Sequence, residues 1–520
     1  MIIKILKHND VHVRVDCETS VAQELSDYFT FNIPGAYFMP AFRSRVWDGK
    51  IRLFNAYTGI IYKGLVPYIC KFAKDRKYNI EKKLEYDFLE KVDLNDVADF
   101  IDNLKLYDQD PDGKYIPIKL FEHQLSSIIY SIQNSRCLIL SPTGSGKSLI
   151  IYVLMRFYQH FLFGFGKKFN EKDYVGQIEK IDKKILLIVP TISLVHQMFT
   201  NFADYAYKDK TWDVNLNCHM IYEGQKKETD KPIVISTWQS VYKMPKKWFS
   251  KFYVVFGDEC HQYKANSLKS IMHKLENCPY RIGTTGTIDD TKTHKLIIEG
   301  LFGAIYHSVS TKELIEKQQL ATLKIKCLVL KYPELVCKEN KKTDYHGELD
   351  FIVSHPGRNR FIRNLALKLE GNTLLLFRYV KKHGRIIYDL IKEKSAKNRK
   401  IFFVYGGTDA ETRESVRRIT EKENDAIIVA SIGVFSIGIN IRRLHNIIFA
   451  SPSKSRIQVF QSIGRALRKA KHKDEATLYD IADNLSYKKH QNYTIKHFLK
   501  RIEYYNAEQF PYKIYEVELK

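Results

Sequence analysis

The residues best suited to chemistry form one short run of small side chains around a single lysine. The run consists of Ser141, Pro142, Thr143, Gly144, Ser145, Gly146, Lys147 and Ser148. Apolar stretches at 137–140 and 149–154 flank the run, which predicts a buried strand, a loop and the start of a helix. Backbone N–H groups at a helix N-terminus point at bound phosphates, and the peptide dipoles favour negative charge there. The pattern therefore predicts a loop that binds the phosphates of a nucleotide.

Lys147 and Ser148 give this loop its expected chemistry. Gly144 and Gly146 let the backbone approach the phosphates closely, Lys147 neutralises phosphate charge, and the Ser148 hydroxyl is suited to bind Mg²⁺. Ser141 stands where the usual motif begins with glycine. Because Gly-Lys-Ser also occurs in ordinary glycine turns, such a turn is the alternative interpretation of the run taken alone.

An acidic pair, Asp258 and Glu259, follows the apolar stretch 253–257, far enough after Lys147 for several intervening strand–helix units. At a strand end, Asp258 is expected to hold Mg²⁺ directly or through water, and Glu259 to polarise the attacking water. A surface turn is the alternative, but the phosphate loop earlier in the chain favours the catalytic interpretation. Before that loop, Gln124 begins a helix, and its amide is able to pair with the edge of an adenine.

The second half of the chain has its own alternation of strands and helices, without a second phosphate loop. Arg465 and Arg468 lie three residues apart, so they share one face of a predicted helix. Two guanidinium groups so placed can converge on one phosphate, as an arginine finger does, whereas a solvated basic face is the alternative. We therefore expect this half to complete the nucleotide site of the first half.

Several predicted strands end in a polar residue at the edge where parallel sheets bind ligands. Thr191 and Thr237 end two strands of the first half and are candidates to contact nucleic-acid phosphates. Arg378 and Ser431 end two strands of the second half and are their proposed counterparts. Strand caps and solvent-facing strand ends are the alternatives.

The N-terminal region carries a basic stretch, 43–53, around a tryptophan. Its Asp-Gly step predicts a hairpin turn between two strands. The cations and the aromatic ring suit a phosphate backbone and a stacked base, and the candidate residues are Arg45, Trp47, Lys50 and Arg52. The alternative places Trp47 in the core of a small domain with the arginines facing solvent.

Composition and charge narrow the class of protein. The chain has 520 residues, a formal net charge of +24 and 44% hydrophobic residues, which together predict several globular domains and a polyanionic partner. Its eight cysteines form no Cys-x-x-Cys pair, and no apolar run reaches membrane-spanning length, so we expect a soluble, intracellular protein without zinc or disulfides. The expected parts are an N-terminal nucleic-acid-binding domain, two sheet domains and a basic C-terminal segment, over residues 1–112, 113–305, 306–485 and 486–520.

Taken together, the motifs over residues 118–485 resemble those of superfamily 2 helicases and translocases. The matching positions are Gln124, Thr143 to Ser148, Asp258, Glu259, His261, Thr285 to Thr287, Gln461, Gly464, Arg465 and Arg468. The resemblance implies an α/β fold of two RecA-like parallel-sheet domains with a small N-terminal α+β domain, and an ATP- and Mg²⁺-dependent enzyme. It also implies that His261 and Gln461 sense the γ-phosphate and that Gly438 contributes to nucleotide binding. Asn440 stands where this family usually has an aspartate, which leaves the coupling role of that position unassigned.

The Asp-Glu-Cys-His box, the Ile-Ser-Thr-Trp-Gln run and the N-terminal Trp-Asp-Gly-Lys-Ile-Arg element resemble the bacteriophage UvsW family of DNA helicases. This resemblance implies activity on branched DNA, meaning recombination intermediates, stalled forks and R-loops with their RNA–DNA hybrid, together with strand annealing in recombination, repair and replication. It implies a monomer in the cytoplasm of a phage-infected bacterium, with recombination or single-strand-binding proteins as partners and no membrane. The alternatives are an RNA helicase, a restriction-type translocase without its nuclease, and a non-enzymatic annealing protein.

Overall fold

The computed structural model describes most of the chain: residues 1–33, 35–84, 93–110, 113–162, 183–288, 292–396, 398–434, 441, 443–451, 453–467 and 473–519. It forms two compact units, one of Met1–Ser141 with Gly146–Ser308 and one of Pro142–Ser145 with Val309–Lys520. Among these residues no helix combines the length and apolarity that crossing a bilayer requires.

The first unit begins with a small sheet in the order β5-β2-β1-β6, in which β1 pairs antiparallel with β2 and parallel with β6. Alternate residues of β1, Ile3 and Ile5, are fully buried against the helices of this domain. The elements are β1 (Ile2–Lys7), β2 (His12–Asp16), α1 (Thr19–Tyr28), β5 (Ile60–Tyr62), η2 (Lys63–Leu65), α3 (Val66–Asp75) and β6 (Asn79–Lys83).

The hairpin predicted at 43–53 is wrong. The segment holds η1 (Ala36–Phe38), α2 (Pro40–Arg43) and β4 (Lys50–Arg52), and the antiparallel partner of β4 is β3 (Thr30–Asn32). Pro40 suits the first turn of α2, which ends at Arg43. The residues expected to form the first strand of the hairpin therefore begin at the C-terminal end of a helix. Gly49, with φ +77°, makes the turn into β4. Trp47 is half-buried, and its indole N–H donates to the Lys50 carbonyl at 2.8 Å.

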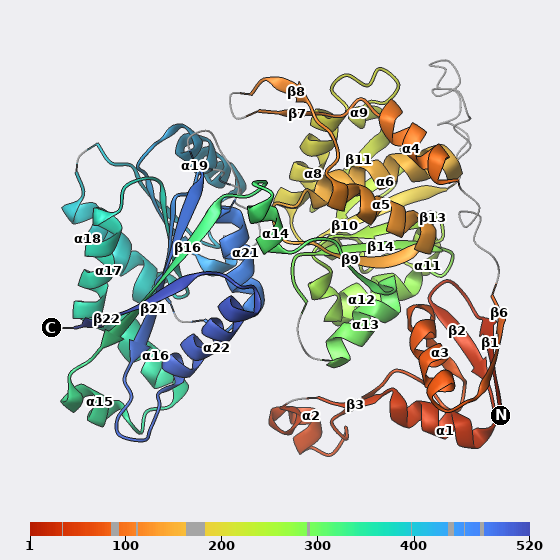
Figure 1. Ribbon diagram of the computed structural model, residues 1–520, viewed down its shortest axis with the longest axis horizontal. Helices are drawn as coiled ribbons and strands as arrows, with labels where there is room; N and C mark the ends of the chain where they lie inside the picture. Colours follow the sequence, from red (N-terminus) through yellow and green to blue (C-terminus); the bar gives the residue numbers. More distant parts are fainter. Residues whose placement is uncertain are drawn as a thin grey trace. The chain divides into compact units, whose positions relative to one another are not determined.

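The main body of the first unit is a seven-stranded parallel sheet in the order β11-β12-β10-β13-β14-β9-β15 (Figure 1). Its strands are β9 (Arg136–Leu140), β10 (Lys184–Val189), β11 (Cys218–Ile221), β12 (Ile233–Thr237), β13 (Phe252–Gly257), β14 (Tyr280–Thr285) and β15 (Ile305–His307). The apolar stretches before the phosphate loop and the acidic pair are β9 and β13, as predicted.

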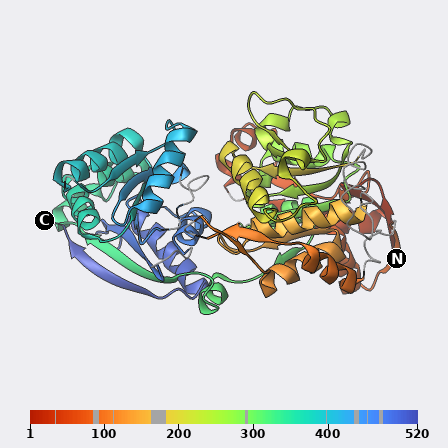
Figure 2. The ribbon, with the colours of Figure 1, turned by 90° about the horizontal axis from the view of Figure 1, so that it is seen from above.

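Helices cover both faces of this sheet, as Figures 1 and 2 show. In β9, Leu138 packs on one side with α10 to α13, while Cys137 and Ile139 pack on the other with α4, α5, α6 and α8. Burial on both faces explains why the strands read as continuous apolar runs. The helices are α4 (Leu94–Asn103), α5 (Glu122–Asn134), α6 (Lys147–Leu162), α8 (Ile192–Tyr205), α9 (Val214–Asn217), α10 (Trp238–Val241), α11 (Lys246–Phe249), η4 (Cys260–Lys264), α12 (Asn266–Lys274) and α13 (Lys292–Phe302), with a small hairpin of β7 (Tyr107–Gln109) and β8 (Tyr115–Pro117).

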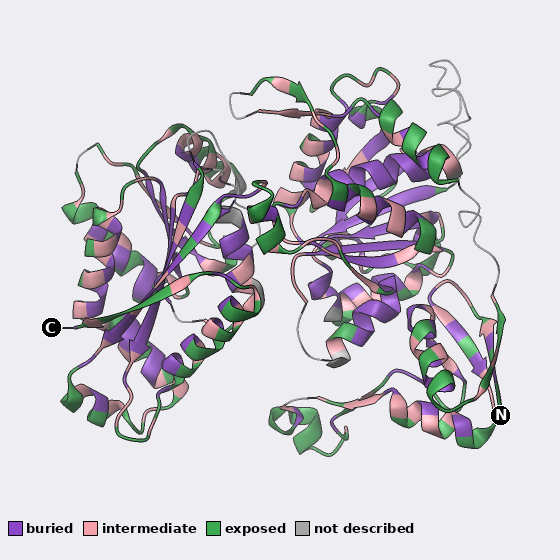
Figure 3. Cartoon of the chain, viewed as in Figure 1, coloured by how far each residue is buried: buried purple, intermediate pink, exposed green. Residues whose placement is uncertain are grey.

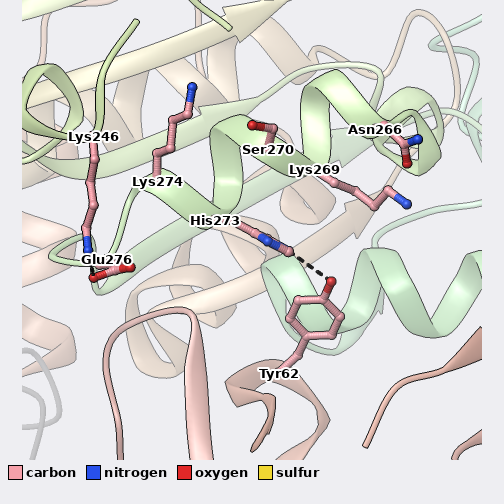
Figure 4. Close-up of a pocket in the computed structure, with 8 residues that line it drawn as sticks. All are labelled: Tyr62, Lys246, Asn266, Lys269, Ser270, His273, Lys274 and Glu276. Carbon is pink, nitrogen blue, oxygen red and sulfur yellow. Dashed lines mark hydrogen bonds and ion pairs between the residues drawn. The ribbon is translucent and has the colours of Figure 1, made fainter. Parts of the chain in front are cut away.

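The N-terminal domain packs against α12 and α13 and shares one hydrophobic core with them. The Tyr68 hydroxyl donates to Glu299 at 2.7 Å, and the Tyr62 hydroxyl lies 2.9 Å from Nε2 of His273, at the rim of a cavity of about 480 Å³ (Figure 4). Gly64 permits the approach, because a Cβ there would lie 2.1 Å from the Glu299 carbonyl oxygen. These contacts attach the domain firmly to the larger sheet.

The second unit contains a parallel sheet of the same size, in the order β18-β19-β17-β20-β21-β16-β22. Its strands are β16 (Thr322–Lys331), β17 (Thr373–Phe377), β18 (Ile401–Val404), β19 (Ile427–Ser431), β20 (Asn446–Phe449), β21 (Glu475–Asn484) and β22 (Tyr512–Glu518). Two buried clusters, one on each face, enclose the central strands, which Figure 3 shows as buried. The expectation of two RecA-like domains is confirmed.

The residues expected to form a basic C-terminal segment, 486–520, fold as part of this unit. β22 pairs with β16 as the edge strand, and α22 packs on β21. Arg501 of α22 donates two hydrogen bonds to Asp480 of β21, at 2.9 and 2.7 Å, and both side chains are buried. The helices are α14 (Thr311–Glu316), α15 (Glu334–Asn340), α16 (Tyr345–Ser354), α17 (Pro356–Lys368), η5 (Val380–Gly384), α18 (Arg385–Lys394), α19 (Ala410–Lys422), α21 (Arg456–Ala466) and α22 (Tyr493–Ala507).

Candidate nucleotide site and nucleic-acid contacts

The topology of the first sheet brings the predicted motifs to one edge. The phosphate loop follows β9, the acidic pair follows β13, and β14, which ends at Thr285, lies between these two strands. Because all strands are parallel, their carboxyl ends meet where such sheets bind ligands. The backbone N–H of Ser141 donates to the Thr285 carbonyl at 3.0 Å, which ties the start of the loop to the neighbouring strand end.

The loop adopts a backbone that only glycine accepts without strain. Gly144 and Gly146 have φ of 89° and 86°. A Cβ on Gly146 would lie 2.2 Å from Nε2 of Gln124, so a side chain there has no room. The helix α6 starts at Lys147, which aims its first backbone N–H groups into the loop.

Lys147 and Ser148 are held by neighbours that a ligand is able to replace. The Lys147 ammonium donates to the Ser141 carbonyl at 3.1 Å, and the Ser148 hydroxyl lies 2.9 Å from the hydroxyl of Tyr205. Both residues are half-buried. The sequence reasoning missed Tyr205, because a tyrosine at the end of a helix 57 residues away carries no motif.

Asp258 is 7% exposed and accepts a hydrogen bond from the Thr284 hydroxyl at 2.8 Å. Burial, and then the negative charge of Glu259, raise the pKa of Asp258 to about 6, against the opposing charge of Lys147. Two adjacent carboxylates, one of them desolvated, are unfavourable without a nearby cation. This arrangement fits a divalent metal ion.

The oxygen donors also fit Mg²⁺ in kind. Ser148 and Asp258 supply a hydroxyl and a carboxylate, and Mg²⁺ in nucleotide sites takes few protein ligands beside water and phosphate oxygens. Within the described ranges no group of three or more His, Cys, Asp or Glu could hold a metal ion. The residues therefore suit an ion that arrives with a nucleotide.

His261 links the acidic box to the end of β14. Its Nδ1 lies 3.1 Å from the Thr285 hydroxyl and 3.3 Å from Oε2 of Glu259, and the side chain is 8% exposed. The Thr285 hydroxyl in turn donates to the Thr287 carbonyl at 3.0 Å. The imidazole of His261 therefore connects the Glu259 carboxylate with the Thr-Gly-Thr element at the end of β14.

Gln124 lies beside the loop, on α5. Its Oε1 accepts from the backbone N–H of Phe121 at 2.9 Å, and the side chain is 3% exposed. This contact closes the first turn of α5 and leaves the adenine contact a prediction.

The expected nucleotide residues of the second half lie partly outside the described chain. Gln461 lies on α21 and is 9% exposed. Arg465 lies on the same helix, with its side chain outside the described part. Gly438 and Arg468 lie wholly outside the described residues, as does Asn440.

The two threonines predicted to contact nucleic acid have local roles. The Thr191 hydroxyl caps α8 by accepting from the Leu194 N–H at 3.4 Å. Thr237 is 4% exposed, and its hydroxyl lies 2.9 Å from that of Ser240. These local contacts leave the nucleic-acid contacts of both threonines a prediction.

Arg378 and Ser431 do lie side by side, since Phe377 at the end of β17 is in register with Ser431 at the end of β19. Arg378 is exposed, whereas Ser431 is buried. In the N-terminal domain Arg45 and Lys50 are exposed, and Arg52, also exposed, forms an ion pair with Asp48 at 2.5 Å.

Three family models match this chain. The model described as "DNA helicase UvsW, N-terminal" matches residues 2–82. "Type III restriction enzyme, res subunit" matches residues 117–290, which hold the phosphate loop and the acidic box. "Helicase conserved C-terminal domain" matches residues 357–470.

Full-length relatives extend these matches. The chain is 35% identical to the "ATP-dependent DNA helicase uvsW" of Enterobacteria phage T4, over 100% of both chains. It is 25% identical to the "DNA 3'-5' translocase XPB2" of Sulfurisphaera tokodaii, over 84% of this chain and 92% of the relative. The crystal structure of T4 UvsW matches with a TM-score of 0.51 and 34% identity, over 100% of both chains. The chain therefore belongs to the UvsW family of ATP-dependent DNA helicases, within superfamily 2.

Proposed function

We propose that this helicase uses the hydrolysis of Mg²⁺–ATP to remodel branched DNA, namely recombination intermediates, stalled forks and R-loops, and that it also anneals strands. One observation supports ATP hydrolysis as the energy source: Lys147, Ser148 and Asp258 all lie at the same edge of the first sheet. Membership in the UvsW family supports DNA as the substrate. We propose a monomer that works with recombination or single-strand-binding proteins, with boundaries near residues 112 and 305 between the N-terminal domain and the two sheet domains.

The chemistry follows from the charges at that edge. Lys147 and the N–H groups at the start of α6 bind the phosphates, and Ser148 and Asp258 would hold Mg²⁺, which neutralises charge on the phosphate oxygens. Glu259 orients the attacking water and receives its proton. His261, hydrogen-bonded to Thr285, reports the state of Glu259 to the end of β14.

The second unit contributes through the motif on α21. In this proposal Arg465 and Arg468 stabilise the charge that develops on the transferred phosphoryl group, and Gln461 senses the γ-phosphate. Gln124 reads adenine, and Gly438 lies against the nucleotide. Each cycle of ATP binding and hydrolysis then changes the affinity of the protein for the bound DNA strand, and repeated cycles move the protein along that strand in steps.

The preference for branches is supported by an exposed apolar tip in the N-terminal domain. Five large apolar side chains there are exposed to solvent, and Figure 3 colours most of the α2 ribbon as exposed. They are Tyr37 (60% exposed), Phe38 (65%), Met39 (42%), Phe42 (38%) and Val46 (83%). The tip also carries the exposed cations Arg43, Arg45 and Lys50. Flat apolar side chains among cations suit the unstacked end of a duplex next to its phosphates.

The experiment measures ATPase rates with single-stranded, duplex, forked, Holliday-junction and R-loop substrates, and with RNA. We expect a forked or Holliday-junction substrate to stimulate most at equal nucleotide concentration. A higher rate with RNA would favour an RNA helicase, and no hydrolysis with any nucleic acid would favour the annealing protein.

Replacing the tip tests its part in this preference. Tyr37→Ser with Phe38→Ser should reduce stimulation by forks to the level given by single strands and leave single-strand stimulation unchanged. The matched control is Tyr57→Ser, because Tyr57 is 98% exposed in the same domain and lies away from the tip in the sequence. Equal losses with forks and single strands would remove the tip from branch recognition.

A further inference from the structure

Four side chains gather at the carboxyl edge of the second sheet, and among them only Arg378 was predicted from the sequence to contact nucleic acid. Arg378 follows β17 and Lys454 follows β20, and both are exposed. Tyr345 is the first residue of α16, and Tyr493 is the first residue of α22. Parallel sheets bind ligands at this edge, so its exposed side chains are placed to meet one.

The two tyrosines form one aromatic surface with His497. The Tyr345 ring centroid lies 6.0 Å from that of Tyr493 and 5.3 Å from that of His497. Tyr493 and His497 are four residues apart on α22 and therefore share a face. Tyr493 is 40% exposed and Tyr345 is half-buried, so their rings are not enclosed in the core.

A buried carboxylate fixes the positions of these rings. Glu348 of α16 is 3% exposed and accepts the backbone N–H groups of Tyr493 and Thr494, at 2.8 and 2.7 Å. A carboxylate at a helix N-terminus is favoured by the helix dipole. α16 and α22 are thereby held together, as Figure 1 shows, and the two tyrosines are set in place before any ligand arrives.

Cations flank the aromatic surface. The Arg378 guanidinium donates to the Tyr345 hydroxyl at 3.2 Å. Burial, and then the positive charges of Lys454 and Arg501, lower the pKa of His497 to about 4. The imidazole is therefore neutral at neutral pH, and Arg378 and Lys454 carry the positive charge beside the rings.

We propose that Tyr345 and Tyr493 stack on the bases of single-stranded DNA, while Arg378 and Lys454 bind its phosphates. Partly exposed aromatic rings beside cations are the pattern of surfaces that bind single strands without sequence preference, and the Lys496 ammonium, 5.7 Å from the Tyr493 ring centroid, adds a third cation. A duplex hides its base faces, so this surface selects an unpaired strand. The inference rests on the proposed DNA motor and assigns two aromatic residues to its strand-binding path.

The test compares full-length variants in their binding to oligothymidylate. Tyr345→Ala with Tyr493→Ala should weaken binding by about 10-fold or more, since base stacking on one aromatic side chain is worth about five- to 150-fold. Tyr345→Phe with Tyr493→Phe should stay within about twofold of wild type, because phenylalanine keeps the stacking face. A strand that contains 2-aminopurine should lose its stacking-dependent fluorescence change only in the alanine variant.

The matched control is Tyr515→Ala, because Tyr515 is 42% exposed on β22 of the same unit. It should leave both readouts unchanged. Alanine variants that bind like wild type, or phenylalanine variants as weak as the alanine variants, would overturn the inference. If wild-type protein hydrolyses ATP without any response to DNA, the proposed motor fails instead, so the two failures are distinguishable.

Discussion

At the residue scale, the proposed site for ATP hydrolysis needs one cation, Lys147, and one carboxylate, Glu259, at the edge of the first sheet. Lys147→Ala should remove most of the affinity for ATP, and Glu259→Gln should lower kcat by at least about 100-fold, because general-base catalysis is worth about 10²–10⁴-fold. DNA binding should remain within about threefold of wild type in both variants. Steady-state ATPase assays and fluorescence anisotropy measure the two effects, with Lys269→Ala and Glu228→Gln as controls elsewhere in the same unit. Wild-type hydrolysis in either test variant would disprove the site.

The sequence predicts Lys147, Asp258 and Glu259 because each lies in a local pattern that follows an apolar strand. It does not predict Tyr205 or Thr284, which hold Ser148 and Asp258 in the structure. Those contacts join residues far apart in the chain, and a tyrosine or threonine at an element end has many ordinary roles.

At the element scale, the C-terminal helix depends on one buried ion pair. Asp480→Asn should destabilise the second unit by about 3–5 kcal/mol, because it leaves the Arg501 charge buried without its partner. Urea unfolding, with hydrogen exchange followed in α22 and β22, measures the loss. Asp350→Asn is the control, since the ion pair of Asp350 with Lys382 is exposed, and it should change stability little. Equal effects of the two substitutions would contradict the assignment.

The strands of the two large sheets differ in how well the sequence predicts them. β10, β13 and β17 are apolar over most of their length because both faces of each are covered. β22 carries mostly exposed side chains at the sheet edge, so it lacks the continuous apolar run that marks the central strands. The Asp-Gly step before β4 predicts a turn between two consecutive strands. In the structure β4 pairs with β3, and α2 lies between these two strands in the chain. Pairing across an intervening helix leaves no mark in the local sequence.

At the scale of the whole molecule, the net charge of +24 predicts that DNA affinity depends steeply on salt. Each cation that contacts a phosphate of a single strand adds about 0.7 to the slope of log affinity against log salt. Lys454→Gln should therefore flatten the slope for oligothymidylate by roughly that amount. Lys324→Gln should not, because Lys324 lies on β16 and already forms an ion pair with Glu475 at 2.6 Å. Affinity measured over a range of salt concentrations gives both slopes. Equal flattening by the two substitutions would mean that affinity reflects the total charge rather than a defined path for the strand.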